Sequence, residues 1–164
     1  MALVVAKFGG TSVASPERIQ KVAQRLIEKK LAGDDVVAVV SAMGKTTDEL
    51  VGLAAALNSA PSKREMDMLL STGEQVSMSL LAMAIQARGY QAISFTGWQA
   101  GIQTDDDFSR AKIEDIHAER IAQALETGAI VVVAGFQGLS EDGNITTLGR
   151  GGSDTTAVAL AHGI

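Results

Sequence analysis

Two runs of this chain are continuously apolar and rich in valine, and they restrict the fold more than any other feature. They form the central part of the strands expected at residues 35–41 and 129–134. A strand with one face in water alternates apolar and polar residues, so continuous runs are typical of strands covered on both faces. Further strands are expected at residues 3–7 and 90–95. The sequence therefore predicts an α/β protein with a mainly parallel sheet.

Helical segments separate these strands. Ser15-Pro16-Glu17 has the features of a helix start, with a capping hydroxyl, a proline at the first position and an acid in the first turn. Apolar residues then recur at helical spacing from Ile19 to Leu31, and Gly33 ends the run. A helix between two buried strands predicts a β-α-β unit. Asp142-Gly143 predicts a hairpin, and other helices are expected at 48–57, from residue 64, at 76–85, at 118–127 and after residue 154.

The composition excludes several classes of function. A chain of 164 residues with 46% hydrophobic content forms about one globular domain. A net charge of -5 and few aromatic residues argue against nucleic-acid binding. The absence of cysteine excludes disulfides and thiolate metal sites. No apolar run approaches the roughly 18 residues of a membrane span, and no basic leader precedes one, so we expect a cytoplasmic protein without membrane partners.

The acidic run Asp105-Asp106-Asp107 is the only stretch that suggests a metal site. Three consecutive acids in a loop are usually solvated, and no second cluster of ligands accompanies them. We therefore predict no protein-bound metal site there.

The segment Lys7-Phe8-Gly9-Gly10-Thr11-Ser12 places a lysine where the first strand must end. The two glycines allow backbone N–H groups to approach an anion closely, because no Cβ obstructs it. Lys7 can then act as a point charge on phosphate oxygens. The segment is consistent with a phosphate cradle, or with an ordinary glycine turn beside a solvated lysine.

A second glycine-rich segment, Gly149-Arg150-Gly151-Gly152-Ser153-Asp154, precedes the last expected helix. Its glycines and the helix N-terminus would form another anion cradle. The guanidinium of Arg150 can hold a carboxylate with two parallel hydrogen bonds. As an alternative, Ser153 or Asp154 is an ordinary helix cap.

The segment from Ser41 to Thr47 follows a buried strand and is rich in small and hydroxyl residues. It is not a P-loop, because Val39 occupies the position where that motif needs a glycine. Open α/β sheets bind ligands at such strand ends. Thr46 or Thr47 could equally be a helix cap.

The segment Ser71-Thr72-Gly73-Glu74 precedes an almost wholly apolar helical run. Ser71 and Glu74 fit a capping box, as do Thr72 and Gln75. The local pattern therefore offers both a structural and a ligand-binding interpretation of Glu74.

Together, and in this order, these four segments resemble the aspartokinase family, and the resemblance spans essentially the whole chain. It implies the three-layer αβα, carbamate-kinase-like fold of the amino-acid kinase group. It also implies transfer of the γ-phosphate of Mg-ATP to the side-chain carboxylate of L-aspartate. The product would be 4-phospho-L-aspartate, the first step toward lysine, threonine and methionine. Family members are usually dimeric or larger, so a homo-oligomer is expected.

The resemblance also assigns roles to individual residues. Lys7 and Asp154 would be catalytic, and the backbone of Gly9, Gly10, Gly151 and Gly152 would bind phosphate. A carboxylate nucleophile is already ionised at pH 7, so the chemistry needs positioning and charge neutralisation without a general base. The residues implied to bind aspartate are Ser41, Thr47, Glu74, Phe136, Arg150 and Ser153.

The resemblance implies that residues 1–164 are the N-terminal portion of a single kinase domain, without the nucleotide half and the regulatory domains. We therefore expect this piece alone to bind ATP weakly and to turn over negligibly. Two alternatives stay open. One is another small-molecule kinase of the same fold, acting on glutamate, acetylglutamate, carbamate or a nucleotide. The other is a non-catalytic binding or assembly module. Glu74 together with Arg150 favours an α-amino acid substrate.

Overall fold

A computed structural model describes residues 1–149 and 151–164. Its central sheet has the strand order β1-β2-β6-β3, and every pair of neighbours is parallel. The predicted parallel sheet is therefore confirmed; β1 is one residue longer than expected, and the other three strands are one or two residues shorter. The bounds are β1 (Leu3–Phe8), β2 (Asp35–Val40), β3 (Ala92–Phe95) and β6 (Ile130–Ala134).

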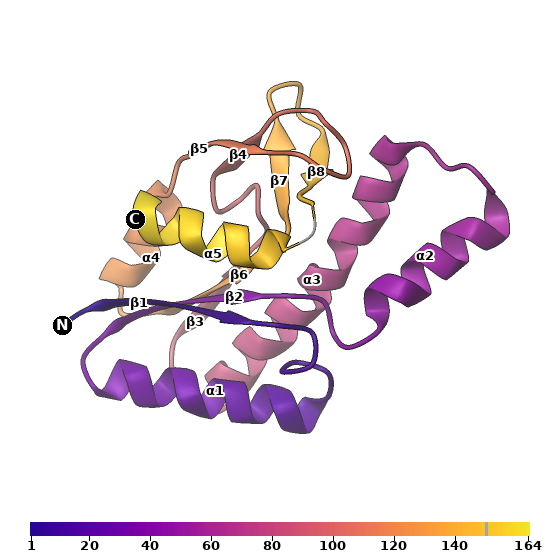
Figure 1. The fold of residues 1–164 in the computed structure, drawn as a ribbon. Coiled ribbons are helices and arrows are strands. Elements are labelled where there is room, and N and C mark those ends of the chain that lie inside the picture. Colours follow the sequence, from indigo (N-terminus) through magenta and orange to yellow (C-terminus); the bar gives the residue numbers. More distant parts are fainter. Residues whose placement is uncertain (150) are drawn as a thin grey trace.

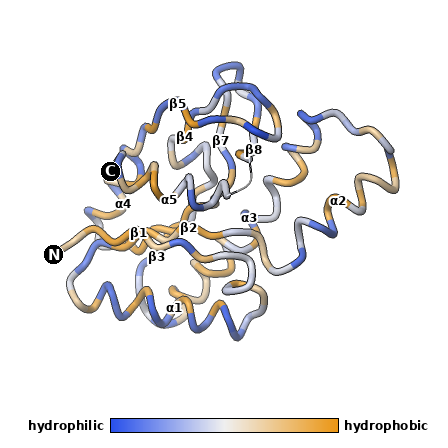
Figure 2. The backbone as a smooth tube through the Cα atoms, viewed as in Figure 1, coloured by the Kyte–Doolittle hydropathy of each residue, from blue (hydrophilic) through white to orange (hydrophobic). Residues whose placement is uncertain are grey.

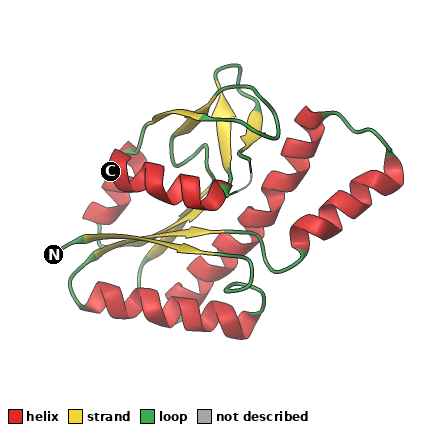
Figure 3. Cartoon of the chain, in the orientation of Figure 1, coloured by secondary structure: helices red, strands yellow, loops and turns green. Residues whose placement is uncertain are grey.

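Helices cover both faces of this sheet, which gives the predicted three-layer αβα architecture (Figures 1 and 3). One face carries α1 (Pro16–Leu31) and α3 (Lys63–Gln86), and the other carries α4 (Glu119–Glu126) and α5 (Gly152–Gly163). Successive strand residues point to opposite faces. Val36 and Val40 therefore pack beneath α1 and α3, while Val37 and Val39 pack beneath α4 and α5. Because both faces of these strands are covered, their valine runs are continuous. Figure 2 shows that the central strands are apolar.

A second, smaller sheet lies at the end of the molecule where α3 begins (Figure 1). Its order is β5-β4-β7-β8. The Asp142-Gly143 hairpin is confirmed, because β7 and β8 pair antiparallel and Gly143 has a positive φ of 82°. The short β4 and β5 were not predicted, because three or four residues carry too little pattern. The bounds are β4 (Ile102–Thr104), β5 (Ile113–Ile116), β7 (Gln137–Ser140) and β8 (Ile145–Thr147).

Helix α3 is continuous through the segment Ser71-Thr72-Gly73-Glu74, so the capping-box interpretation of Glu74 is wrong. The helix begins after Ser62, whose hydroxyl accepts from the Glu65 amide at 3.3 Å. The hydroxyls of Ser71 and Thr72 donate to carbonyls one turn earlier in the helix instead of capping it. Gly73 does not end the helix. A Cβ there would lie 2.9 Å from the Ala42 Cβ, so the glycine permits close packing.

The other capping alternatives are also wrong. Helix α2 (Thr46–Leu57) follows Lys45, which makes no side-chain cap, so Thr46 and Thr47 both lie in its first turn. Helix α5 follows Gly151, whose φ of 77° lies in the left-handed region that suits glycine. Ser153 and Asp154 therefore lie inside the first turn of α5.

Helix α3 is the one described helix that is long and apolar enough to cross a membrane by length and composition. Here it packs as a core helix, because Leu81 and Ile85 are fully buried beneath the sheet. Two carboxylates on the same helix, Asp67 and Glu74, are also buried.

Candidate functional site

A pocket of about 330 Å³ opens at the carboxyl ends of β1 and β2. It lies between the two glycine-rich segments, the loop after β2, and α3. All the predicted site residues that the structure describes line it, with the exception of Gly9. Arg150 lies outside the described residues. The lining residues are Lys7, Gly10, Ser41, Ala42, Gly44, Thr47, Glu74, Phe136, Gly149, Gly151, Gly152, Ser153 and Asp154.

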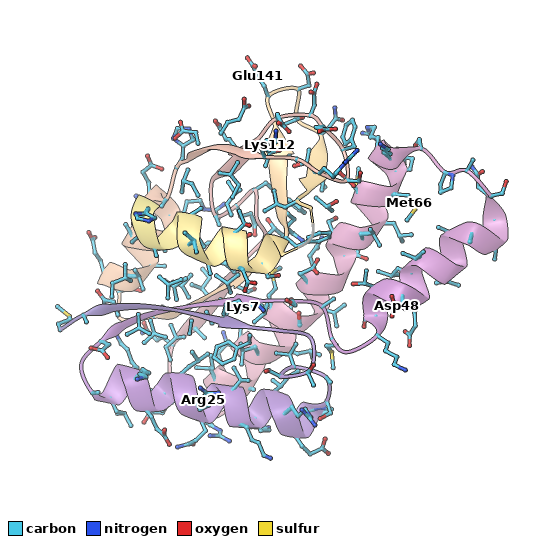
Figure 4. All side chains as sticks on the ribbon, viewed as in Figure 1. Lys7, Arg25, Asp48, Met66, Lys112 and Glu141 are labelled. Atoms are coloured by element: carbon cyan, nitrogen blue, oxygen red, sulfur yellow. The ribbon has the colours of Figure 1, made fainter. Side chains whose placement is uncertain are left out.

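Lys7 and Asp154 form an ion pair at this pocket, with 3.2 Å between Nζ and Oδ1. Lys7 faces α5, because it is an odd-numbered residue of β1 and shares a face with Val5. Figure 4 shows the Lys7 side chain between the central sheet and α5. The two side chains are 35% and 69% exposed, so a ligand could reach both. Gly9 lies close to Lys7, because a Cβ built on Gly9 would be 3.5 Å from Lys7 Nζ.

The first glycine segment packs closely against the loop after β2. A Cβ on Gly10 would lie 2.9 Å from the carbonyl oxygen of Ala42, which cannot move without the backbone. The amide of Gly44 donates to the carbonyl of Gly10 at 3.0 Å. Glycine is therefore required at position 10 for packing.

The second glycine segment is fixed by similar close contacts. A Cβ on Gly152 would lie 2.7 Å from the Phe136 ring. Phe136 itself has a positive φ of 73°, a strained conformation for a bulky residue. Its amide donates to the hydroxyl of Thr156 on α5 at 3.2 Å. Such strain persists only where the surroundings over-determine it, as they do in functional sites.

Two serines join the loop after β2 to α5. The hydroxyl of Ser41 donates to the hydroxyl of Ser153 at 2.9 Å. The Ser77 hydroxyl on α3 donates to the carbonyl of Ser41 at 2.6 Å. Hydrogen bonds therefore join the loop after β2, α3 and the first turn of α5, which lie far apart in the sequence.

Glu74 is a buried acidic residue that lines the pocket, and it is only 3% exposed. Burial raises the pKa of Glu74 from 4.5 to about 7, although hydrogen bonds from backbone amides and from Gln137 oppose that rise. Its Oε2 accepts from the Ala42 amide at 3.2 Å. A carboxyl group in this state gains from a cationic partner, because the partner would favour its ionised form.

Gln137 holds Glu74 in place, and sequence reasoning missed it. Its Nε2 donates to the carbonyl of Ser71 at 2.9 Å and lies 3.5 Å from Oε1 of Glu74. Its Oε1 accepts from the Gly97 amide at 3.1 Å. Gln137 is fully buried in β7, in a segment whose glycines indicated only a loop. Ala42, Gly44 and Gly149 were also missed as lining residues.

The family model for the amino acid kinase family matches residues 2–164. The chain belongs to the amino acid kinase family. It is 67% identical over 161 residues to an aspartokinase from Bacillus sp. (strain MGA3), covering 98% of this chain and 39% of that protein. The chain therefore spans about two fifths of the length of that relative.

Solved aspartate kinases share the fold of this amino acid kinase chain. The structure of aspartate kinase from Synechocystis has a TM-score of 0.81 at 52% identity, covering 96% of this chain and 26% of that one. E. coli aspartokinase III, in complex with aspartate and ADP, has a TM-score of 0.84 at 27% identity. That comparison covers 98% of this chain and 46% of the E. coli chain.

The acidic run Asp105-Asp106-Asp107 forms a turn in this amino acid kinase chain. Oδ1 of Asp105 accepts from the amides of Asp107 and Lys112 at 3.2 and 3.1 Å. Within residues 1–149 and 151–164, no group of three or more His, Asp or Glu side chains is arranged to hold a metal ion.

Proposed function

We propose that residues 1–164 form the aspartate-binding part of an aspartate kinase. The intact protein would transfer the γ-phosphoryl group of ATP to the side-chain carboxylate of L-aspartate, giving 4-phospho-L-aspartate. This would be the first step toward lysine, threonine and methionine. The observation that carries the proposal is that the Lys7–Asp154 ion pair and buried Glu74 line one glycine-rich pocket. The 67% identity to an aspartokinase supports it.

Glu74 in its ionised form would bind the ammonium group of aspartate. A buried carboxylate is costly without a partner, so a cation is the ligand that this position favours. Ser41, Thr47 and Ser153 offer hydroxyl groups on the pocket wall, and Phe136 offers an apolar surface. Arg150 is assigned to the α-carboxylate of aspartate on the sequence resemblance alone.

Lys7 would neutralise charge on the phosphoryl group, and Asp154 would hold the Lys7 ammonium in position from 3.2 Å away. Backbone N–H groups of Gly9 and Gly10, and of Gly151 and Gly152, would hold phosphate oxygens. The N-terminus of α5 adds a partial positive charge equivalent to roughly half a unit. Phosphoryl transfer to an ionised carboxylate then requires mainly positioning and electrostatic stabilisation.

The residues present fit the phosphate end of Mg-ATP. Gly10, Gly151 and Gly152 line the pocket, and a glycine places no Cβ between its backbone amide and an anion. Asp154 offers an exposed carboxylate beside Lys7, the ligand type that Mg²⁺ takes alongside phosphate oxygens. When bound, Mg²⁺ would neutralise charge on the phosphates.

We infer that adenosine contacts and feedback regulation belong to parts of the intact protein other than residues 1–164. This chain spans 39% of the length of a close relative, in line with that division. The 164-residue piece alone would then bind ATP weakly and turn over negligibly. We also propose that the intact protein is a cytoplasmic homo-oligomer.

Calorimetric titration of residues 1–164 with L-aspartate, L-glutamate and a nucleoside monophosphate tests the proposal. We expect aspartate to bind, glutamate to bind more weakly, and the nucleotide not to bind. Binding of glutamate or the nucleotide alone would instead identify another kinase of this fold. Absence of binding to all three would favour a non-catalytic module. A coupled ADP-release assay with aspartate and Mg-ATP tests the inactivity of the piece, which robust turnover would contradict.

A further inference from the structure

Asp67 is a second buried carboxylate on α3, and it lies outside the pocket. It is fully buried and lies seven residues before Glu74, so both face the same side of the helix. Its carboxylate accepts hydrogen bonds from two segments. The Ser109 amide donates to both oxygens at 3.1 and 3.0 Å, and Thr147 donates through its amide and its hydroxyl, each at 2.8 Å.

Both partner segments of Asp67 adjoin the start of the second glycine segment. Thr147 ends β8 and stands two residues before Gly149, which lines the pocket. The Ala111 amide donates to the Thr147 carbonyl at 3.0 Å. A Cβ built on Gly149 would lie 3.8 Å from the Cγ of Arg110, so the two residues are in close proximity. One carboxylate therefore fixes the strand that leads into the glycine segment and the loop that packs against it.

Ser109 adopts a conformation that needs this support. Its φ is 71°, in the left-handed region that is uncommon for residues other than glycine. Its amide is the one that points at both oxygens of Asp67. A buried carboxylate and a strained serine are each unfavourable alone, and here each stabilises the other.

We propose that Asp67 is a positioning residue, which sets the distance between the glycine segment at 149–152 and Glu74 and thereby the affinity of the pocket for its substrate. The proposal rests on the proposed function for the identity of that substrate. Seven residues of a helix span about 10 Å, so α3 is a rigid spacer between Asp67 and Glu74. Weakening the Asp67 contacts frees one wall of the pocket while leaving Glu74 in place.

The test uses four variants of residues 1–164. Asp67→Asn keeps the shape of the side chain but replaces one accepting carboxylate oxygen with an NH₂ group, which then faces a donor. Thr147→Val removes only the hydroxyl donor of Thr147. Thr147→Ser retains that donor and should restore wild-type behaviour. The control is Leu125→Ala, which creates a cavity beneath α4 on the opposite face of the central sheet.

Two measurements are made at a temperature where circular dichroism shows each variant to be folded. The first is the set of backbone amide chemical shifts of Gly149, Gly151 and Gly152 without ligand. The second is the calorimetric Kd for L-aspartate. We expect Asp67→Asn to move these shifts and to raise Kd about tenfold, the effect of one lost hydrogen bond to a charged group. Leu125→Ala should change neither.

The proposal is overturned if Asp67→Asn moves the glycine amides no more than Leu125→Ala does, or moves them without weakening binding. If Asp67→Asn does not fold, the comparison of Thr147→Val with Thr147→Ser decides the question by the same two readouts. If the wild-type chain itself does not bind aspartate, the proposed function fails. The glycine amide shifts, which need no ligand, still decide whether Asp67 positions the segment.

Discussion

The Lys7 ammonium and the Asp154 carboxylate meet at 3.2 Å, although they come from the first strand and the last helix of the chain. Each of the two glycine segments therefore supplies one member of an ion pair at the mouth of a shared pocket. Both groups are partly exposed, so they are accessible from solvent. Glu74 lines the same pocket.

Replacing Lys7 by methionine removes the positive charge and keeps most of the side-chain volume. In the intact protein we expect kcat to fall by a factor on the order of 100 to 1,000, as for other groups that stabilise charge in a transition state. The Kd for aspartate should change little, because Lys7 is assigned to the phosphoryl group. Steady-state kinetics with calorimetry measures both, and Lys21→Met on the exposed face of α1 is the control. An equal loss of aspartate affinity would assign Lys7 to the amino acid instead.

Replacing Glu74 by glutamine keeps the shape of the side chain but removes its charge. Aspartate binding should weaken by a factor on the order of 100, because truncating one partner of a buried charge pair costs several kcal/mol. Calorimetry measures the loss, with Glu126→Gln on the exposed end of α4 as the control. Unchanged affinity in Glu74→Gln would show that the ammonium group binds elsewhere.

The stability of the ligand-free chain should depend on the ionisation of Glu74. Its pKa is about 7 in the folded state, against an ordinary value of 4.5 for a glutamate. Well below pH 4.5, Glu74 is protonated in both the folded and the unfolded chain. As the pH rises above 4.5, Glu74 loses its proton in the unfolded chain while the folded chain still keeps it. The free energy of unfolding should therefore fall between about pH 4.5 and 7, by up to about 3 kcal/mol from this group. Urea denaturation across that range measures the slope, and wild type and Glu74→Gln would have parallel profiles if the assignment is wrong.

The aspartate affinity should have the opposite pH dependence. An ammonium group binds the carboxylate form of Glu74, so the Kd should fall as the pH rises through about 7. Calorimetry between pH 5.5 and 8.5 would reveal the trend, and Glu74→Gln should remove it. An affinity that is flat across the range in wild type would contradict the role of Glu74.

Replacing Gly10 by alanine should disturb the contact between the first glycine segment and the loop after β2. The new Cβ would meet the carbonyl oxygen of Ala42 at 2.9 Å, so overpacking should destabilise the chain by about 1–3 kcal/mol. Gly52→Ala is a matched control, because nothing lies within 4 Å of its Cβ position in α2. That change should be neutral or stabilise the helix by up to about 1 kcal/mol. Urea denaturation of both variants compares them directly, and equal stabilities would show that the loops have room.

The sequence was sufficient to predict the parallel sheet, because burial on both faces leaves a direct mark on β2 and β6. It was insufficient at Ser71-Thr72-Gly73-Glu74, because the same letters suit a capping box and the middle of a helix packed on Ala42. Only tertiary contacts distinguish these, and they make Gly73 a packing residue. Gln137 and Asp67 were missed for a related reason. Their roles lie in hydrogen bonds to Glu74, Ser109 and Thr147, which no local pattern reveals.

The half-titrated state of Glu74 has a consequence for any ligand with a positive charge. Near pH 7 about half of the molecules carry a proton on this carboxyl, so an arriving ammonium group must expel it. Binding would then release roughly half a proton per site into the solvent. The apparent enthalpy of association should accordingly vary with the ionisation heat of the buffer, in Tris differently from phosphate.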